Sequence, residues 1–285
     1  ILGNINHEKL IDHELSINNL NNSKVILEPK SRNTAPAVAI LIEYLMGKGK
    51  SNDIVVFLPS DAFINNTDDF KDYLLEGMEI ATRDRVVCFG IRPLYPETGY
   101  GYVKLGKKIK QNSYLVDRFI EKPNREKAIK FMKDGGYLWN AGIFMSKVSM
   151  LHNLFLKYQK NLLLNIDETL KKSREIGNKM FIDREQFIKS DDISIDYAII
   201  ENLNSDNLAV ISMNLVWSDV GSYKSLFDIN NSKTKENNIT SGNIILHNTE
   251  NCFIKSSNKK ICCIDVDDLV VVEEDDVILV MKKEK

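Results

Sequence analysis

The chain has 285 residues, of which 43% are hydrophobic and 27% charged, and its formal net charge is −2. This length can bury a substantial core, and these values are typical of a globular chain rather than a disordered one. The small net charge gives no broad attraction to nucleic acid or to a membrane surface, so we expect ligands to bind at a local site.

In the first third of the chain, strands and helices alternate. Residues 34–46 carry apolar side chains at helical spacing, and 53–64 is a β-branched run that ends at Pro-Ser-Asp. A second helix is predicted over 68–83 and a second strand over 85–91. This alternation indicates an α/β, doubly wound sheet, in which ligands bind beyond the carboxyl ends of strands. We therefore expect 53–64 to be a buried parallel strand that delivers Asp61 to a site.

The middle of the chain is more mixed. The pattern predicts a turn-rich segment at 96–106, a strand at 114–123 and a helix at 125–134. The segment YLWNAGIFMSK follows, and then long helical stretches over about 147–177 and a short helix at 222–229.

Beyond a polar stretch, the sequence changes character. Five short strand-like runs follow between residues 242 and 282, spaced by roughly 8 to 10 residues and separated by turn signals, which is typical of an all-β appendage. We place a boundary near 235–241 and expect domains at 1–236 and 237–285.

Cysteine usage and apolar runs suggest the cellular setting. The four cysteines lie in apolar, strand-like runs without CxxC spacing, namely Cys88, Cys252, Cys262 and Cys263. Reduced core thiols in a cytoplasmic protein are the simplest reading. Apolar runs such as 54–58 are far short of a membrane span, and no signal-peptide pattern opens the chain. We expect neither a membrane nor a nucleic-acid partner.

Two aspartates, Asp61 in LPSD and Asp219 in WSDVGSY, each follow an apolar segment at a sharp turn. They could converge on one Mg²⁺, which favours a couple of carboxylates together with phosphate oxygens. The alternative is two independent turn aspartates that accept backbone N–H groups.

Three further segments offer ligand-binding side chains. Gly101 in ETGYGYVKLG would let the backbone approach a ligand, although a simple hairpin explains it equally well. Glu121 and Lys122 in FIEKPN pair a hydroxyl-binding carboxylate with a phosphate-binding ammonium, unless they form an ordinary surface pair. Asn140 in YLWNAGIF can both donate to and accept from a sugar hydroxyl.

A polar cluster follows a predicted strand in ILEPKSRNTAPA, residues 26–37. Glu28, Arg32, Asn33 and Thr34 could read the edge of a purine base, since carboxylates and amides pair with ring N–H and amino groups. Asn33 or Thr34 could also cap the helix that follows, with Pro36 in its first turn. The two roles are compatible because capping and base reading use different groups.

Seven phrases occur in the order found in one enzyme family: EPKSRNTAPA, FLPSDAFI, PETGYGYV, FIEKPN, YLWNAGIF, SIDYAIIE and WSDVGSY. With them the chain resembles the mannose-1-phosphate guanylyltransferases, within the sugar-phosphate nucleotidylyltransferase family. The resemblance implies a Rossmann-like, doubly wound mixed sheet followed by a small left-handed β-helix-like tail.

The resemblance also implies a reaction in which mannose 1-phosphate attacks the α-phosphorus of GTP and forms GDP-mannose and pyrophosphate. Asp61 and Asp219 would then hold Mg²⁺, and Lys122 would meet the sugar phosphate. The resemblance further implies that Glu121 and Asn140 bind mannose hydroxyls and that Gly101 offers its backbone to the sugar. Glu28, Asn33 and Thr34 would face the guanine, and Asp196 would support the pocket.

Some features depart from the family pattern. The glycine-rich GGxGxRLxP loop that cradles the triphosphate is not found in this chain, which suggests an N-terminally truncated chain that is inactive alone. Ala62 stands where the family often has His, and Tyr223 where Trp is frequent. The edges of a β-helical tail suggest a homodimer.

Three alternatives stay open. One is a transferase for another sugar 1-phosphate or another base. Another is a metal-dependent glycosyltransferase, although such enzymes usually carry a DxD-like element rather than two distant aspartates. The third is a relative that binds ligands without catalysis.

Overall fold

The computed structural model describes residues 1–283. Contacts divide the chain into two compact units, each described here by itself. The larger unit comprises 1–58 and 68–214, and the smaller unit comprises 59–67 and the residues from 215 onwards.

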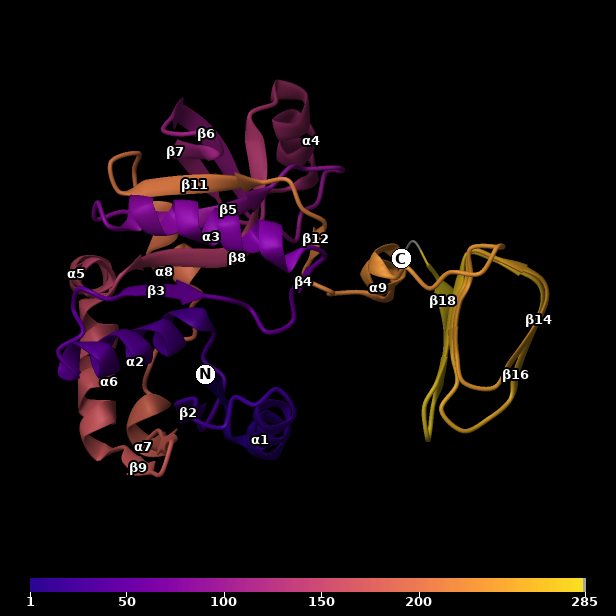
Figure 1. The fold of residues 1–285 in the computed structure, drawn as a ribbon, viewed down its shortest axis with the longest axis horizontal. Helices are drawn as coiled ribbons and strands as arrows, with labels where there is room; N and C mark the ends of the chain where they lie inside the picture. The colour runs from indigo at the N-terminus through magenta and orange to yellow at the C-terminus, as the bar shows by residue number, and fades with distance from the viewer. Residues whose placement is uncertain (284–285) are drawn as a thin grey trace. The chain divides into compact units, whose positions relative to one another are not determined.

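Two sheets and the helices packed on them build the larger unit (Figure 1). Its strands are β1 (Leu2–Asn4), β2 (Val25–Glu28), β3 (Ile54–Phe57), β5 (Val86–Ile91), β6 (Tyr102–Lys108), β7 (Ser113–Ile120), β8 (Tyr137–Lys147), β9 (Arg174–Ile176), β10 (Lys179–Phe181) and β11 (Leu208–Met213). Its helices are η1 (Ile5–His7), α1 (Glu8–Ile17), α2 (Thr34–Gly47), α3 (Thr67–Ala81), α4 (Arg125–Asp134), α5 (Val148–Tyr158), α6 (Lys160–Lys172), α7 (Arg184–Phe187), α8 (Ile195–Ala198) and η2 (Ile200–Asn202).

The main sheet has six strands in the order β3-β8-β5-β11-β7-β6. Strands β5 and β11 are parallel and the other pairings are antiparallel. The second sheet has the order β1-β2-β10-β9, in which β1, β2 and β10 run parallel. This arrangement confirms the predicted mixed α/β class.

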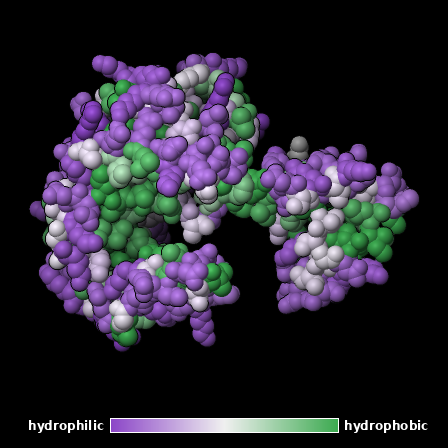
Figure 2. Space-filling view, in the orientation of Figure 1, coloured by the Kyte–Doolittle hydropathy of each residue, from purple (hydrophilic) through white to green (hydrophobic). Residues whose placement is uncertain are grey.

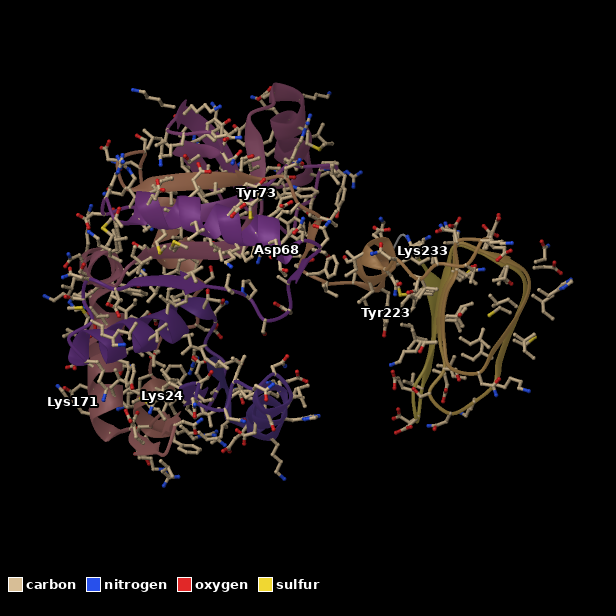
Figure 3. All side chains as sticks on the ribbon, viewed as in Figure 1. Lys24, Asp68, Tyr73, Lys171, Tyr223 and Lys233 are labelled. Carbon is tan, nitrogen blue, oxygen red and sulfur yellow. The ribbon has the colours of Figure 1, made fainter. Side chains whose placement is uncertain are left out.

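Helices cover both faces of the main sheet, which explains why all six residues of β5 are buried. On one face, Gly77 of α3 lets Phe89 pack close, since a Cβ at Gly77 would lie 2.9 Å from the Phe89 ring. On the opposite face, Cys88 joins a core cluster with Leu151 of α5 and Ala198 of α8. Helix α3 also holds the end of β11, because the Tyr73 hydroxyl accepts the N–H of Asn214 at 3.2 Å (Figure 3).

The expectation of a buried parallel strand at 53–64 is wrong. Strand β3 covers only Ile54–Phe57, pairs antiparallel with β8 and forms an edge of the main sheet, where Val56 is 37% exposed. A β-branched run favours a strand in either direction. Its direction is set by the partner strand, which the run itself does not specify.

The long helical stretch predicted over 147–177 is also shorter in the structure. Helix α5 ends at Tyr158 and α6 ends at Lys172, and a hairpin of β9 and β10 follows. Gly177, at a φ of 60°, occupies the left-handed turn of this hairpin, where glycine is favoured.

The smaller unit contains a two-stranded pair, one helix and stacked short strands (Figure 1). Its elements are β4 (Phe63–Ile64), β12 (Trp217–Ser218), α9 (Tyr223–Ile229), β13 (Ile239–Ser241), β14 (Ile244–Glu250), β15 (Phe253–Lys255), β16 (Ile261–Asp267), β17 (Leu269–Glu273) and β18 (Ile278–Lys282). Strands β13, β15 and β17 pair in parallel, as do β14 and β16, which confirms a β-helix-like tail.

The later coils of this tail repeat with a period of 17 residues, whereas the step from β13 to β15 is 14 residues, and polar side chains stack at the corners. Asn248 donates to Asp265 at 2.7 Å, and Asn251 donates to Asp268, each pair 17 residues apart. All four residues have φ between 46° and 56°. Asn and Asp tolerate this left-handed conformation better than other side chains with a Cβ, so they suit these corners.

The core of the tail is small. Cys252, Ile254, Cys263 and Val271 form its buried cluster. Cys262 is exposed, contrary to the expectation of four core thiols, because neighbouring residues of a strand point to opposite faces.

Helix α9 packs onto the tail through its aromatic side chains. The Lys283 ammonium lies 3.7 Å from the ring centre of Phe227, and Lys233 lies 4.4 Å from the same ring. The Tyr223 and Phe253 rings are 5.6 Å apart (Figure 3).

Hydrophilic side chains cover most of the surface seen in Figure 2, while apolar side chains gather in a hollow of the larger unit. Within residues 1–283, no helix combines the length and the apolar character needed to cross a membrane.

Candidate active site

A buried glycine, a carboxylate and an amide meet where β6, β7 and β8 lie side by side in the larger unit. Gly101 directly precedes β6, and a Cβ at this position would lie 2.6 Å from Glu121 Oε2 and 3.3 Å from the Cβ of Asn140. The Asn140 N–H donates to the Gly101 carbonyl at 2.8 Å. Only glycine leaves room for this close approach, so the contacts support more than a plain hairpin.

A bulge in β8 aims the Asn140 side chain. The register between β5 and β8 shifts between Cys88 and Gly90, and Gly142 takes the left-handed φ of 69° within this bulge. Asn140 Oδ1 accepts the Gly142 N–H at 3.2 Å, and Nδ2 donates to Asp196 Oδ1 at 3.0 Å. Since an amide has two donor and two acceptor sites, one of each stays available for a ligand.

Glu121 and Lys122 leave β7 through an unusual turn. Lys122 has a φ of 44° and directly precedes Pro123, a combination uncommon for a residue with a side chain. The Lys122 Nζ lies 3.7 Å from Glu121 Oε1, and the two side chains are 57% and 7% exposed. The ammonium is thus open to an anion, whereas the carboxylate is enclosed.

Three carboxylates lie close enough to influence one another here. Burial and the nearby Asp196 and Glu201 charges raise the pKa of Glu121 to about 7, partly offset by Lys122. Burial also raises the pKa of Asp196, against the hydrogen bond from Asn140. Near neutral pH, Glu121 is therefore divided between its protonated and ionised forms.

The residues predicted to read a base lie at the end of β2 and the start of α2. Burial raises the pKa of Glu28 to about 7, and its Oε1 has no hydrogen-bond partner within residues 1–283. Arg32 donates from its guanidinium to the Ile188 carbonyl. Asn33, at a φ of 62°, accepts the Thr34 N–H at 3.0 Å and so begins the helix as its cap.

Thr34 connects the base-reading residues with the sugar-binding residues. Its Oγ1 accepts the Ile195 N–H at 2.9 Å, and the next residue, Asp196, accepts from Asn140. The Thr34 hydroxyl is thus already engaged in fixing the start of α8, and its role toward a base stays a prediction.

Asp61 and Asp219 both lie in the smaller unit, apart in sequence from the residues above. Strands β4 and β12 pair antiparallel, with Phe63 opposite Ser218. The chain before Phe63 and the chain after Ser218 therefore leave the ladder at the same end, and these two stretches carry Asp61 and Asp219.

The turn after β12 is shaped around Asp219. Asp219 Oδ1 accepts the Gly221 N–H at 3.3 Å, and Val220 between them has a φ of 50°. A β-branched residue at positive φ is a strained outlier of the kind that clusters at functional sites.

The donor set at this end of the ladder suits Mg²⁺. Two carboxylates are hard oxygen ligands, and Mg²⁺ is commonly held by one or two carboxylates together with substrate phosphates. Within residues 1–283 there is no group of three or more His, Cys, Asp or Glu side chains able to hold a metal by themselves. A metal held here thus needs ligand oxygens from elsewhere, and its presence stays a prediction.

One residue of the site was not singled out from the sequence. Glu201, in η2, accepts the Glu121 N–H at 3.2 Å through its Oε1. It closes the phrase SIDYAIIE, but a glutamate at the end of an apolar run carries no signal of its partner.

The chain matches two family models. Residues 1–236 match the family described as nucleotidyl transferase, and residues 242–285 match the family described as MannoseP isomerase/GMP-like beta-helix domain.

Curated relatives match along the whole chain. The mannose-1-phosphate guanylyltransferase of Escherichia coli is 33% identical over 288 residues, which cover 100% of this chain and 60% of that relative. The alginate biosynthesis protein AlgA of Pseudomonas aeruginosa is 32% identical, covering 93% of this chain and 55% of that protein. The chain thus spans about 60% or less of the length of these relatives.

Among solved structures, one from Thermus thermophilus titled mannose-1-phosphate geranyltransferase has a TM-score of 0.83 at 24% identity. It covers 99% of this chain and 80% of that one. A structure titled mannose-6-phosphate isomerase from Helicobacter pylori has a TM-score of 0.68 at 25% identity, with 76% and 84% coverage. The first likeness supports the fold along nearly the entire chain.

Proposed function

Because the chain belongs to the nucleotidyl transferase family, we propose that it transfers GMP from GTP to mannose 1-phosphate and yields GDP-mannose and pyrophosphate. The observation that carries this proposal is the meeting of Gly101, Glu121, Lys122 and Asn140 at one place in the larger unit. The name of the Escherichia coli relative supports the choice of substrates.

The sugar is bound through hydroxyl contacts and one charge. Glu121, being partly protonated near neutral pH, can either donate to or accept from a hydroxyl, and Asn140 keeps one donor and one acceptor. The exposed Lys122 ammonium meets the sugar phosphate. The backbone at Gly101 approaches the sugar ring because no side chain intervenes.

The base is read at the start of α2. The Glu28 carboxyl, whose Oε1 has no hydrogen-bond partner within residues 1–283, can accept the ring N–H and amino group of guanine when it is ionised. Asn33 contributes its amide NH₂, since its oxygen caps the helix.

The reaction needs alignment more than covalent chemistry. An oxygen of the sugar phosphate bonds to the α-phosphorus of GTP, the bond from that phosphorus to the bridging oxygen breaks, and pyrophosphate leaves with that oxygen. Holding the two reactants in line lowers the barrier by removing the entropy of their encounter. Lys122 offsets the negative charge of the attacking phosphate.

Asp61 and Asp219 would hold Mg²⁺, which neutralises phosphate charge when it is bound. The strained turn at Val220 keeps Asp219 in one orientation for this role.

A pyrophosphate-release assay of the protein at its natural length tests the substrates. GTP, ATP, UTP and dTTP are each combined with mannose 1-phosphate and with glucose 1-phosphate. We expect GTP with mannose 1-phosphate to be preferred, and a preference for UTP or dTTP would reject the guanine assignment. Lys122→Ala should raise the KM for the sugar phosphate, whereas Lys130→Ala, an exposed position of α4, should not.

A further inference from the structure

The turn that carries Glu121 and Lys122 lacks the usual supports of a strand end. Strand β7 ends at Ile120, which is the last residue paired with β6. The N–H of Glu121 therefore has no partner in the sheet ladder. A positive φ at Lys122, directly before a proline, adds a conformation that persists only where neighbouring groups enforce it.

Glu201 supplies the missing partner. Its Oε1 accepts the Glu121 N–H at 3.2 Å, and η2, which carries Glu201, contacts β7. Helix α8 directly precedes η2 and carries Asp196, whose carboxylate accepts a hydrogen bond from Asn140. Residues 195–202 thus form one short segment that carries both carboxylates.

This segment is itself fixed at several points, so it can act as a rigid support. The Gln159 side chain donates to the Ala198 carbonyl at 3.2 Å, and the Tyr158 hydroxyl donates to the Asn202 carbonyl at 3.3 Å. At its other end, the Ile195 N–H donates to Thr34.

We propose that Glu201 is a positioning residue of the sugar-phosphate site: by accepting the Glu121 N–H, it holds the turn that aims the Glu121 carboxylate and the Lys122 ammonium. The identity of the ligand rests on the proposed function, but the positioning role does not require it. Glu201 itself need not touch the substrate.

The charge of Glu201 also raises the pKa of Glu121, and this effect can be separated from the hydrogen bond. The charged groups that act on Glu121 are Asp196 from α8, Lys122 from its own turn and Glu201 from η2. Replacing Glu201 by Gln keeps an oxygen that can accept the N–H and removes the charge, whereas Ala removes both. The two variants therefore separate the hydrogen bond from the charge.

The first test uses the ligand-free protein. The pKa of Glu121 is measured by NMR of glutamate labelled with ¹³C at the carboxyl, and its resonance is assigned with Glu121→Gln. Glu201→Gln should lower the pKa of Glu121 by about half a unit, because one nearby negative charge is lost. Hydrogen exchange at residues 121–122 should accelerate in Glu201→Ala and stay near the wild-type rate in Glu201→Gln. Glu185→Ala, an exposed glutamate of α7, is the matched control and should change neither.

The second test measures mannose 1-phosphate affinity across pH. Glu201→Ala should weaken binding about three- to tenfold, the size expected when one hydrogen bond of ordinary net strength is lost. Glu201→Gln should retain binding within about twofold, with its pH profile displaced to lower pH. A merely structural residue would lower affinity equally at all pH values.

The outcomes separate the two proposals. If Glu201→Ala leaves the exchange at residues 121–122 at the wild-type rate, the positioning role is rejected even where the Glu121 pKa changes, because the pKa reports the charge of Glu201 and not its hydrogen bond. If the wild type does not bind mannose 1-phosphate while those two measurements change as expected, the substrate assignment fails and the positioning role stands.

Discussion

Replacing Glu121 by Gln is expected to stabilise the larger unit at high pH, although it removes a side chain proposed to bind the sugar. The pKa of Glu121 rises from an ordinary value near 4.5 to about 7, chiefly because the side chain is buried. A raised carboxyl pKa means that the folded state binds the proton more tightly than the unfolded state does. Stability therefore falls as the pH rises between these two values, and the full cost is present above pH 7.

The size of this cost follows from the pKa difference. One pKa unit corresponds to about 1.4 kcal/mol, so the ionised Glu121 costs at most about 3 kcal/mol at pH 8 and about 0.8 kcal/mol at pH 5, and solvent screening of the partly accessible carboxyl lowers both figures. Glutamine is neutral at both values, so Glu121→Gln should raise the free energy of unfolding by these amounts. Glu28 has a similarly raised pKa, but it is present in both proteins and cancels in the comparison.

Urea unfolding at the two pH values measures the effect. The chain has two tryptophans, Trp139 in the larger unit and Trp217 in the smaller unit. In a Trp217→Phe background, the fluorescence of Trp139 reports on the larger unit alone. Glu185→Gln serves as the control and should give no difference between the two pH values.

Two results would refute this reasoning. One is an equal gain in stability at pH 5 and pH 8, which would mean that the gain does not come from ionisation. The other is a loss of stability at pH 8, which would mean that the carboxylate forms favourable contacts that outweigh its burial.

The remaining predictions concern other parts of the molecule. Gly101→Ala should weaken mannose 1-phosphate binding at least tenfold, since its Cβ would displace the Glu121 carboxylate; unchanged affinity by calorimetry would contradict this. Asp219→Asn should abolish Mg²⁺-dependent pyrophosphate release and leave the circular dichroism spectrum intact, whereas normal turnover would return Asp219 to a turn role. Glu273 accepts three backbone N–H groups, including that of Ser257, which hold its pKa below the usual value. The ionised Glu273 therefore stabilises the tail above the ordinary carboxyl pKa, and this stabilisation is lost as the pH falls through the lower pKa of the folded state. Glu273→Gln should destabilise the tail at pH 7 and lose this effect in acid, as measured by urea unfolding followed at Trp217.

The sequence predicts those parts of the fold whose pattern is local. The continuous apolar run of β5 indicates a strand covered on both faces, and it is one. The apolar spacing of α2 predicts that helix, and of the two residues that could cap it, Asn33 and Thr34, the structure uses Asn33. The short strands of the tail are likewise separated by turn residues that can be read directly.

Features that depend on distant partners could not be predicted in this way. The direction of β3 depends on β8, whose paired residues lie about 90 positions later along the chain. That Asp61 lies in one unit with Asp219 follows from the pairing of β4 with β12, two strands of two residues each, too short to give a periodic signal.

The candidate site shows the same division. The motifs supplied Glu121, Lys122 and Asn140, because their residue types suit sugar and phosphate chemistry. They did not supply Glu201 or the raised pKa of Glu121, since both arise from burial and from a contact 80 residues away in sequence.

The 17-residue coil limits how the tail can change in length. Its corners lie at residues such as Asn251 and Asp268, which stack because they occupy equivalent places in successive turns. Inserting one residue between them would bring a different side chain to the corner and turn the following strand inside out. Inserting a whole coil would preserve every stacked pair, and the first coil, which keeps Asn237 stacked on Asn251 with only 14 residues, shows that a coil can shorten where the stacked corner is kept.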